Sequence, residues 1–166
     1  MTVIITDEFT LRPLAVVDLE GFFETMQDSD TKKALNDVPA DIEEAENEIQ
    51  KMLKKVSDGF SEIFTIEVGG KYAGNVTLEY QGYKPCDEGR LHIFIHPDFR
   101  GKGLATKTLK KVIEYGFNER KFVRIFAQCK ASNIAIMKLN QKLGLKVVKE
   151  HINENGVKKV LWVIDA

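Results

Sequence analysis

The stretch that most constrains the fold is the glycine turn in RGKGLATKTLKKVIEYGF, residues 100–117. A strand-like segment, GRLHIFIHP (89–97), precedes it, and from Leu104 onward apolar residues recur at helical spacing. Glycine tolerates the backbone conformations that a sharp turn between a strand and a helix demands. We therefore expect a strand, a short turn and a helix, with the glycines at the helix N-terminus.

Two phosphate-binding patterns can be matched to this turn. The N-terminus of a helix offers unpaired backbone N–H groups and a partial positive charge, so it favours an anion. Counted from Gly101, a nucleotide-binding Walker loop would need a glycine where Thr106 stands. The apolar stripe already begins at Leu104, which leaves no room for a loop of that length. The shorter pattern Arg-x-x-Gly-x-Ala, residues 100–105, fits the turn directly.

The rest of the chain alternates between strand-like and helical segments. Apolar residues alternate or cluster in the predicted strands and recur every three or four positions in the predicted helices. We expect strands at residues 3–11, 62–68, 71–81, 89–97, 122–129, 145–152 and 157–164, and helices at 18–27, 42–56, 101–118 and 132–143.

Short local signals mark the ends of several of these elements. Asp41, with Glu44 three residues on, predicts a capped helix N-terminus. Gly69-Gly70 predicts a tight hairpin turn, and Asn155-Gly156 predicts a hairpin turn of type I′.

This order of elements predicts an α/β fold with a mixed, mostly antiparallel central sheet of about seven strands and about four helices. Parallel pairing is expected only at the crossover around the helix at 101–118. At 166 residues the chain is long enough to bury one sizeable core. A single domain over residues 1–166 is therefore expected.

Composition narrows the possible partners. With 24 Lys and Arg against 25 Asp and Glu, the net charge of -1 gives no general attraction to nucleic acid or to an acidic membrane. The opening MTVIITDEFTLRPL lacks a basic leader and a long apolar run. We expect a soluble, cytoplasmic protein that binds neither nucleic acid nor membrane.

Neither the cysteines nor the histidines have the spacing of a metal site. Cys86 and Cys129 form neither a disulfide framework nor a metal-type motif. Two histidines, His92 and His96, stand four residues apart on a predicted strand, which separates them by about 13 Å. That distance is too long for both to bind one ion, and no metal is expected.

Four stretches together resemble the GNAT (general N-acetyltransferase) superfamily, especially its ribosomal-protein and polyamine acetyltransferases. They are LRPL, YAGNVTL, IFIHPDFRGKGLATKTLKKVIEYGF and ASNIAIMKLNQKLGLKVVKE, and they are spread over almost the whole chain. The turn matches the family's [QR]-x-x-G-x-[GA] pattern. The resemblance implies a GNAT-like (acyl-CoA N-acyltransferase) fold and acetyl-CoA as co-substrate.

The resemblance also implies a set of cofactor-binding residues. Main-chain amides of the turn would bind the pyrophosphate: Arg100, Gly101, Lys102, Gly103, Leu104 and Ala105, with Thr106 adjacent. The Lys102 side chain would reach a phosphate. Backbone groups of the preceding strand would pair with the pantetheine arm: Ile93, Phe94 and Ile95, whose side chains are expected in the core. Asn133 would contact the amide arm, and it or Ser132 is also expected to cap the last helix.

The sequence departs from the family where protons are handled. Many relatives carry a tyrosine acid in LYEKLGF of the last helix, and here that position is Asn140 in LNQKLGL. An amide can donate a hydrogen bond to the cofactor sulfur but cannot give up a proton at neutral pH. A glutamate and a serine of some relatives align with Gln128 and Ile136. Either positioning and oriented dipoles suffice, or another residue moves the proton.

Several residues could take that role. His92 lies on the cofactor strand, and an unperturbed histidine with a pKa near 6.5 is suited to general base work. Glu79, on a hairpin strand, could act through water. A hydroxyl acid could come from Tyr80 or Tyr83. Covalent transfer through Cys129 is disfavoured, because the sequence places no base near it.

Two hypotheses of function follow. The first is an acetyl-CoA-dependent N-acetyltransferase that acts on a primary amine by direct attack in a ternary complex, with His92, Glu79 and Asn140 as candidate catalytic residues. The acceptor would be a protein N-terminus, a polyamine or another small amine, and the protein a monomer or a homodimer. The second is a non-catalytic acyl-CoA-binding or regulatory module of the same fold, suggested by Asn140 and Gln128.

Overall fold

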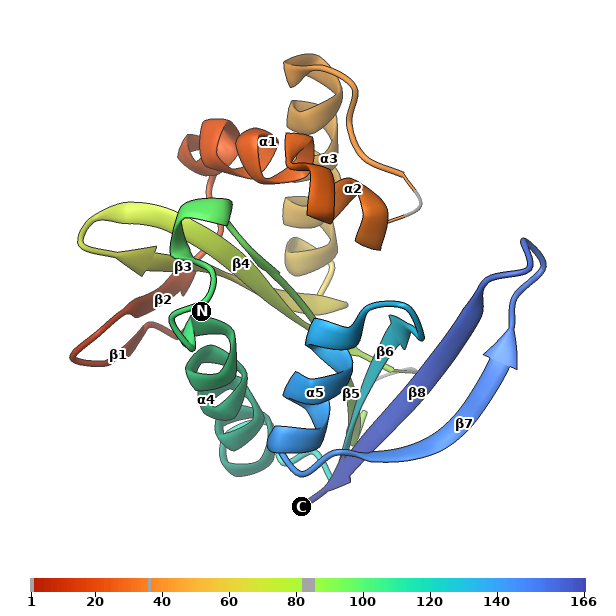
Figure 1. Cartoon of the computed structure of the whole chain (residues 1–166). Coiled ribbons are helices and arrows are strands. Elements are labelled where there is room, and N and C mark those ends of the chain that lie inside the picture. Colours follow the sequence, from red (N-terminus) through yellow and green to blue (C-terminus); the bar gives the residue numbers. More distant parts are fainter. Residues whose placement is uncertain (1, 36, 82–85) are drawn as a thin grey trace. The chain divides into compact units, whose positions relative to one another are not determined.

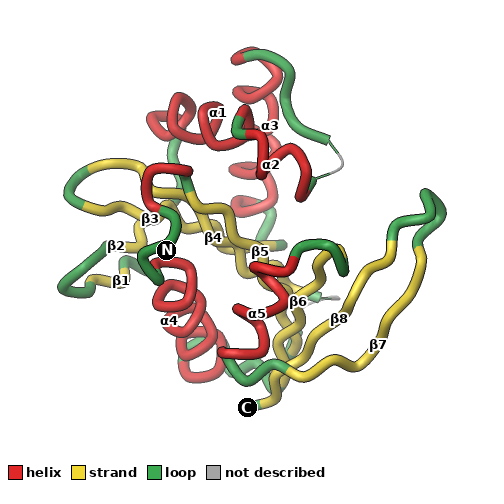
Figure 2. Tube along the Cα trace, viewed as in Figure 1, coloured by secondary structure: helices red, strands yellow, loops and turns green. Residues whose placement is uncertain are grey.

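The computed structural model describes residues 2–35, 37–81 and 86–166. Within these ranges it contains eight strands and five α-helices, and the strands are hydrogen-bonded in the order β1-β2-β3-β4-β5-β6-β8-β7 (Figures 1 and 2). The predicted α/β class with a mixed sheet is confirmed, with one strand and one helix more than expected. Tyr83 lies outside the described residues.

The contacts within the chain divide it into two compact units. Unit 1 comprises Met1–Thr77 and Ile93–Leu104, and unit 2 comprises Leu78–His92 and Ala105–Ala166. Strands β4 (Lys71–Tyr80) and β5 (Glu88–Ile95) each contribute to both units. A single domain over residues 1–166 remains a prediction.

Unit 1 combines three N-terminal strands with three helices. Strands β1 (Ile4–Ile5), β2 (Thr10–Pro13) and β3 (Ser61–Val68) follow one another with antiparallel pairing of β1 with β2 and of β2 with β3. The helices are α1 (Leu19–Gln27), α2 (Ser29–Ala34) and α3 (Ile42–Ser57). Four buried side chains of α1 and α3 form the core between these helices: Phe22, Met26, Ala45 and Ile49. Phe94 of β5 packs against this core.

The predicted single strand at residues 3–11 is wrong. The chain turns between β1 and β2, where the Thr6 hydroxyl oxygen accepts a hydrogen bond from the Phe9 amide at 3.0 Å and the Thr6 amide donates to the Phe9 carbonyl at 3.0 Å. A threonine that bonds its own neighbouring backbone competes with the strand ladder. Such a local bond leaves no periodicity in the sequence.

Helix α2 is the second element that the sequence pattern missed. It has only six residues, SDTKKA, of which Thr31 alone is buried. Its N-cap is Asp28, whose Oδ2 accepts from the amides of Asp30 and Thr31 at 3.1 and 3.0 Å. Because the segment has no apolar stripe, only the cap identifies it.

The predicted cap at Asp41 is confirmed in a modified form. Asp41 Oδ1 accepts from the Glu44 amide at 2.9 Å, as in a capping box. The Glu44 carboxylate, however, accepts from the amide of Ala40 at 2.8 Å, one residue before the cap. Helix α3 therefore begins where predicted.

Arg12, in the stretch LRPL, has a structural role, because its side chain bonds two carboxylates. Its guanidinium donates to both oxygens of Asp18, at 2.7 and 3.0 Å, and to Glu67 at 2.9 Å. Asp18 is buried and also accepts from the Thr65 hydroxyl at 2.7 Å. Burial alone would raise the pKa of Asp18, but the hydrogen bonds, above all those from Arg12, hold it below its ordinary value.

Unit 2 contains the remaining strands and helices. Strands β6 (Arg124–Lys130), β8 (Lys158–Asp165) and β7 (Lys146–Ile152) follow β5 in the sheet, and the helices are α4 (Leu104–Asn118) and α5 (Ile134–Lys142). Strands β5 and β6 are parallel, whereas β6 with β8 and β7 with β8 are antiparallel. The predicted parallel crossover through the helix at 101–118 is confirmed.

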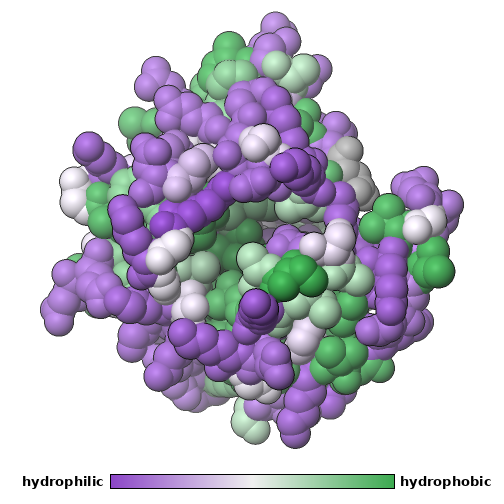
Figure 3. All heavy atoms as spheres, in the orientation of Figure 1, coloured by the Kyte–Doolittle hydropathy of each residue, from purple (hydrophilic) through white to green (hydrophobic). Residues whose placement is uncertain are grey.

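The β7–β8 hairpin differs from its predicted turn. A type I′ turn needs positive φ at both central residues, yet Lys121 is the only non-glycine with positive φ in the described part of the chain, and Gly156 has φ +73°. Asn153 Oδ1 instead accepts from the amides of Asn155 and Val157, at 3.1 and 2.9 Å. The apolar side chains of β7 are partly exposed on this hairpin (Figure 3): Val147, Val148 and Ile152.

No helix in the described part of the chain is long and apolar enough to cross a membrane.

We predict that Asp18→Asn lowers the free energy of unfolding by about 3 kcal/mol, because it leaves the partly buried Arg12 without its main charged partner. As the pKa of Asp18 is lowered by folding, its contribution is fully present above the pKa of an unfolded aspartate, about 3.9, and is lost as the pH falls below it. The difference from the wild-type chain in urea unfolding should therefore shrink on acidification.

The matched control for that variant is Asp58→Asn, which removes an exposed ion pair with Lys54. A surface pair of this kind contributes about 0–1 kcal/mol. Equal losses in the two variants at neutral pH would contradict the role assigned to Asp18.

Candidate active site

The predicted turn between β5 and α4 is present, and two glycines give it its shape. Strand β5 is followed by one 3-10 turn, Pro97–Phe99, and α4 begins at Leu104. Gly101 and Gly103 have φ of +76° and +75°. Residues with a side chain rarely adopt this left-handed conformation, so the two glycines allow the chain to turn sharply into the helix.

The loop from Gly101 to Gly103 leaves the first amides of α4 accessible. The N–H groups of the first turn of a helix have no partner within it and carry a partial positive charge. Residues 101–103 are exposed, and a Cβ placed on either Gly101 or Gly103 would meet no atom within 4 Å. The space beside Gly101 and Gly103 is therefore open, as the approach of a pyrophosphate to this end of the helix requires.

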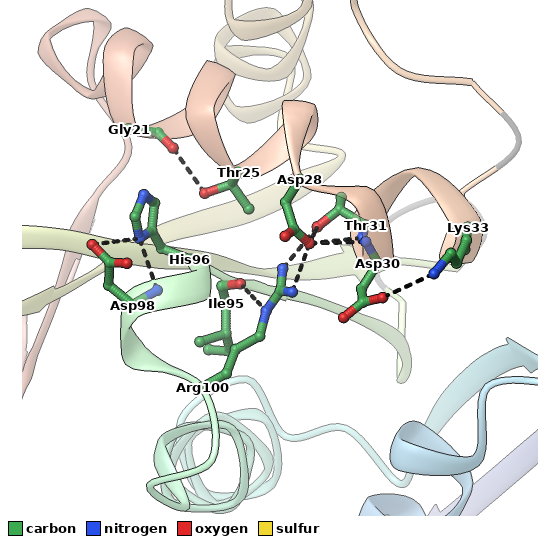
Figure 4. Close-up of polar contacts among 10 residues, drawn as sticks. All are labelled: Gly21, Thr25, Asp28, Asp30, Thr31, Lys33, Ile95, His96, Asp98 and Arg100. Atoms are coloured by element: carbon green, nitrogen blue, oxygen red, sulfur yellow. Dashed lines mark hydrogen bonds and ion pairs between the residues drawn. The ribbon is translucent and has the colours of Figure 1, made fainter.

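The side chain of Arg100 does not reach toward this loop. Its Nε donates to the Ile95 carbonyl at 2.9 Å, Nη1 to Asp28 Oδ2 at 2.6 Å and Nη2 to Thr31 Oγ1 at 2.8 Å (Figure 4). The hydrogen bond from Arg100 lowers the pKa of Asp28 to about 2. The Arg100 amide itself donates to the Pro97 carbonyl at 3.2 Å, and the guanidinium charge is neutralised by Asp28, so both polar groups of this residue are already engaged.

Lys102 is the charged side chain of the loop itself. Its Nζ donates to the Asp98 carbonyl at 3.2 Å and lies 6.0 Å from the centre of the Phe99 ring. The side chain is exposed, so a phosphate could draw it from these weak contacts. Its phosphate role remains a prediction.

The end of β5 extends beyond its pairing with β6. The parallel register runs from Glu88 with Arg124 to Leu91 with Ala127, and the described residues of β5 continue to Ile95. The register with β6 thus ends before Ile93, whereas the Phe94 carbonyl lies against Gly74 of β4 and the Ile95 carbonyl already accepts from Arg100. The expectation that Phe94 packs in the core is confirmed by its contact with the α1 and α3 cluster.

Gly74, a residue that the sequence did not single out, allows β4 and β5 to approach closely here. Its φ is +141°, and a Cβ at this position would overlap the carbonyl oxygen of Phe94. Beside it, the His96 amide donates to the Ala73 carbonyl at 2.9 Å. The glycine in YAGNVTL is the signal that could have indicated this contact.

The two rival candidates for the base lie side by side. His92 Nε2 is 3.6 Å from Glu79 Oε2, and the side chains are 40% and 26% exposed. They come from β5 and β4 and both belong to unit 2. Sequence spacing gave them as alternatives, but the structure brings them together as a pair accessible to solvent.

The two asparagines on or next to α5 differ in what their amides contact. Asn133 is the N-cap of α5, as predicted, with Oδ1 accepting from the Ile136 amide at 3.2 Å, which leaves its Nδ2 as a donor. Asn140 is only 2% exposed, and its Nδ2 is buried with no hydrogen-bond partner among the described residues. A buried donor without a partner costs free energy, so a group that accepts its bond would be stabilised.

Gln128, at the position of the family's glutamate, is already engaged. Its Oε1 accepts from Arg90 Nη2 at 2.7 Å. An amide cannot serve as a base, and this one is held by a cation on the neighbouring strand. Gln128 thus has a structural contact in place of a proton-transfer role.

The remaining candidates have other surroundings. Tyr80 packs edge-on against Phe122, with ring centres 5.4 Å apart. Burial raises the pKa of the Cys129 thiol, which makes it a poorer nucleophile. Among the described residues, no group of three or more His, Cys, Asp or Glu side chains could hold a metal ion.

Known proteins share the sequence pattern and the fold. A family model described as "Acetyltransferase (GNAT) domain" matches residues 8–146. The chain belongs to the GNAT acetyltransferase family. The family resemblance predicted from the turn and the three other stretches is confirmed.

Individual relatives of this GNAT protein have low sequence identity to it. The spermidine N(1)-acetyltransferase of Escherichia coli (strain K12) is 29% identical over 101 residues, which cover 61% of this chain and 54% of that enzyme. A GNAT-family acetyltransferase from Bacillus anthracis has a TM-score of 0.84 at 19% identity, over 99% of this chain and 98% of that one. The ribosomal L7/L12 alpha-N-protein acetyltransferase RimL, in complex with coenzyme A, has a TM-score of 0.86 at 12% identity, over 99% and 98%.

We predict that Gly103→Asp weakens the binding of acetyl-CoA about 20-fold or more in calorimetry. The new carboxylate would stand beside the pyrophosphate in the space that the loop leaves open, and such a loss corresponds to about 2 kcal/mol.

The chain offers a matched control in Gly156→Asp. Gly156 has φ +73°, and a Cβ there also meets no atom within 4 Å, so both variants carry the same backbone strain. The hairpin variant should bind acetyl-CoA as the wild-type chain does. Unchanged binding by Gly103→Asp would exclude this loop as the pyrophosphate site.

Proposed function

We propose that this GNAT protein is an acetyl-CoA-dependent N-acetyltransferase, which transfers the acetyl group to a primary amine by direct attack in a ternary complex. The observation that carries the proposal is the loop before α4, where two left-handed glycines leave the amides of the helix N-terminus open to an anion. The end of β5, which extends past its pairing with β6, supplies backbone groups for the pantetheine arm.

In the proposed reaction, the nitrogen of a neutral amine attacks the thioester carbon. A C–N bond forms, the C–S bond breaks, and the sulfur leaves as thiolate and takes up a proton from solvent. The amine must lose one proton, so a base near the acceptor accelerates the reaction. We assign the removal of the amine proton to His92 and the stabilisation of the departing sulfur to Asn140.

His92 is the proposed base, with Glu79 as its partner. A neutral imidazole can accept a proton near neutral pH, and the carboxylate 3.6 Å away stabilises the cation that results. With 40% of its side chain exposed, His92 can exchange its proton with water. The pair therefore combines both of the candidates that the sequence offered.

Asn140 is proposed to stabilise the departing sulfur. Its buried Nδ2 has no hydrogen-bond partner, and a thiolate is a better acceptor than a thioester sulfur. A donor that gains its partner only as the bond breaks stabilises the transition state more than the bound substrate. Because an amide keeps its proton, the contribution is that of one hydrogen bond.

The acceptor is proposed to be a small amine, such as a polyamine, or a protein N-terminus. Relatives named for spermidine and for ribosomal L7/L12 support both classes. An acidic, exposed face on α3 could attract a cationic amine: Glu43, Glu44 and Glu46. We further propose that the protein is cytoplasmic and is a monomer or a homodimer.

The test is thiol release from acetyl-CoA with a panel of amines that includes spermidine, small monoamines and a peptide with a free N-terminus. Release that depends on one class of amine is the expected result. Tight binding of acetyl-CoA without amine-dependent release from any member would favour the non-catalytic acyl-CoA-binding module, for which the amides at Asn140 and Gln128 argue.

We predict that His92→Gln lowers kcat by about 100-fold, the range for a general base, without weakening acetyl-CoA binding. Glu79→Gln should lower kcat less than His92→Gln does, because it removes the neighbouring carboxylate and leaves the base in place. The same histidine substitution on β7, His151→Gln, is the control and should leave kcat unchanged.

A reversed pattern would contradict this assignment. If Glu79→Gln abolishes turnover at every pH while His92→Gln keeps it, the carboxylate is the base and acts through water. A third variant, Asn140→Ala, should lower kcat by about tenfold or less, the scale of one hydrogen bond.

A further inference from the structure

The contacts of Arg100 join the start of the loop to the end of β5 and to α2, which is distant in sequence. Arg100 stands directly before the pyrophosphate loop, bonds the last carbonyl of β5 and reaches the N-terminus of α2 through Asp28 and Thr31. Figure 4 shows its guanidinium between these groups, pointing away from the loop. The first residue of the loop motif is therefore tied to a helix 72 residues earlier in the chain.

Asp28 has two roles at this junction, and one oxygen serves both. Oδ2 accepts from the amides of Asp30 and Thr31 and caps α2, and the same oxygen accepts from Arg100 Nη1 at 2.6 Å. The side chains of Asp28 and Arg100 are 18% and 33% exposed. Bonds between two ionised groups are stronger than neutral ones, and partial burial reduces their screening by solvent.

The Arg100–Asp28 ion pair lies directly before the glycine loop, at residues 101–103. The two left-handed glycines, Gly101 and Gly103, have no side chains with which to hold the loop, and the described contacts of the Lys102 side chain are with the adjacent turn, at Asp98 and Phe99. The side chain of Arg100 is thus the contact that fixes the start of the loop to the helical part of unit 1. A loop that must present its amides at fixed positions binds an anion more tightly when it is held in that conformation beforehand.

We propose that Asp28 is a positioning residue for acetyl-CoA binding, which acts through Arg100 to hold residues 100–103 in the conformation that receives the pyrophosphate. The inference rests on the proposed function, because it takes acetyl-CoA as the ligand of the loop. Coupling between two sites is reciprocal, so cofactor binding at the loop also stabilises the N-terminus of α2.

The decisive variant is Asp28→Asn. Asparagine is as good an N-cap as aspartate, so α2 keeps its cap while the charged partner of Arg100 is lost. Acetyl-CoA binding in calorimetry should weaken about tenfold, within the usual range for coupled sites. In kinetics the KM for acetyl-CoA should rise, whereas kcat and the KM for the amine stay near their wild-type values.

The neighbouring carboxylate in the same helix gives the control. Asp30 also forms an ion pair, with Lys33, but the two side chains are 74% and 77% exposed, and the described hydrogen bonds of the Arg100 side chain go to Ile95, Asp28 and Thr31. Asp30→Asn removes the same charge from α2 and should leave acetyl-CoA binding unchanged. An equal loss in both variants would mean that the charge of the helix, and not its link to the loop, affects the cofactor.

A double-mutant cycle separates the link from a general loss of stability. Arg100→Gln keeps a residue that the family pattern accepts at this position and removes the guanidinium. Each single variant should weaken acetyl-CoA binding, and the double variant should bind no more weakly than Arg100→Gln alone. Effects that multiply would overturn the proposal.

Hydrogen exchange supplies a readout that a purely structural role would not change. Acetyl-CoA should slow exchange of the α2 amides near Thr31 in the wild-type chain and do so much less in Asp28→Asn. If Asp28→Asn fails to fold, Thr31→Val tests the same link, because it removes the Arg100 Nη2 acceptor and leaves the Asp28 carboxylate.

The outcomes distinguish this inference from the proposed function. Wild-type affinity for acetyl-CoA in Asp28→Asn, with α2 protected as before, would overturn the inference and leave the proposed function intact. A wild-type chain that does not bind acetyl-CoA would overturn both.

Discussion

The parallel pairing of β5 with β6 is the constraint on which the site depends. It ends at Leu91 and Ala127, while β5 runs on to Ile95 and delivers the chain to the loop before α4. A parallel pair requires a crossover, here α4, so the helix N-terminus must follow the carboxyl end of β5. The end of β5 beyond its pairing with β6 and the first amides of α4 therefore follow one another closely, and this succession is the basis of the proposed site for an extended ligand with a phosphate at one end.

Within unit 1, two arginine side chains form ion pairs that stabilise the fold. The Arg12 guanidinium bonds the buried Asp18, and the Arg100 guanidinium bonds Asp28. Both arginines stand in stretches that resemble the family pattern, so from the sequence alone either charge could be assigned to ligand binding. The structure places each guanidinium against a carboxylate, so the proposed pyrophosphate site is assigned to the main-chain amides and the exposed Lys102.

The sequence predicted the parts of this fold that leave a periodic or conformational signal. The glycine turn, the apolar stripe of α4 and the caps at Asp41 and Asn133 are local, so their residues suffice to indicate them. It missed α2 and the turn at Thr6, because each depends on one side chain bonding nearby backbone without an apolar periodicity beside it to mark the element. It also could not show that His92 and Glu79 form a pair, or that Asn140 has a buried donor without a partner, since these facts arise only when strands and helices pack.

The central claim is that the amides before α4 bind the pyrophosphate of acetyl-CoA. The most direct measurement is the backbone amide resonances of Gly101, Gly103 and Leu104 in NMR spectra during titration with coenzyme A and, separately, with pantetheine, which lacks the phosphates. The account predicts large shifts of these amides with coenzyme A and none with pantetheine. Unchanged loop amides at saturating coenzyme A, with shifts elsewhere in the chain, would contradict it.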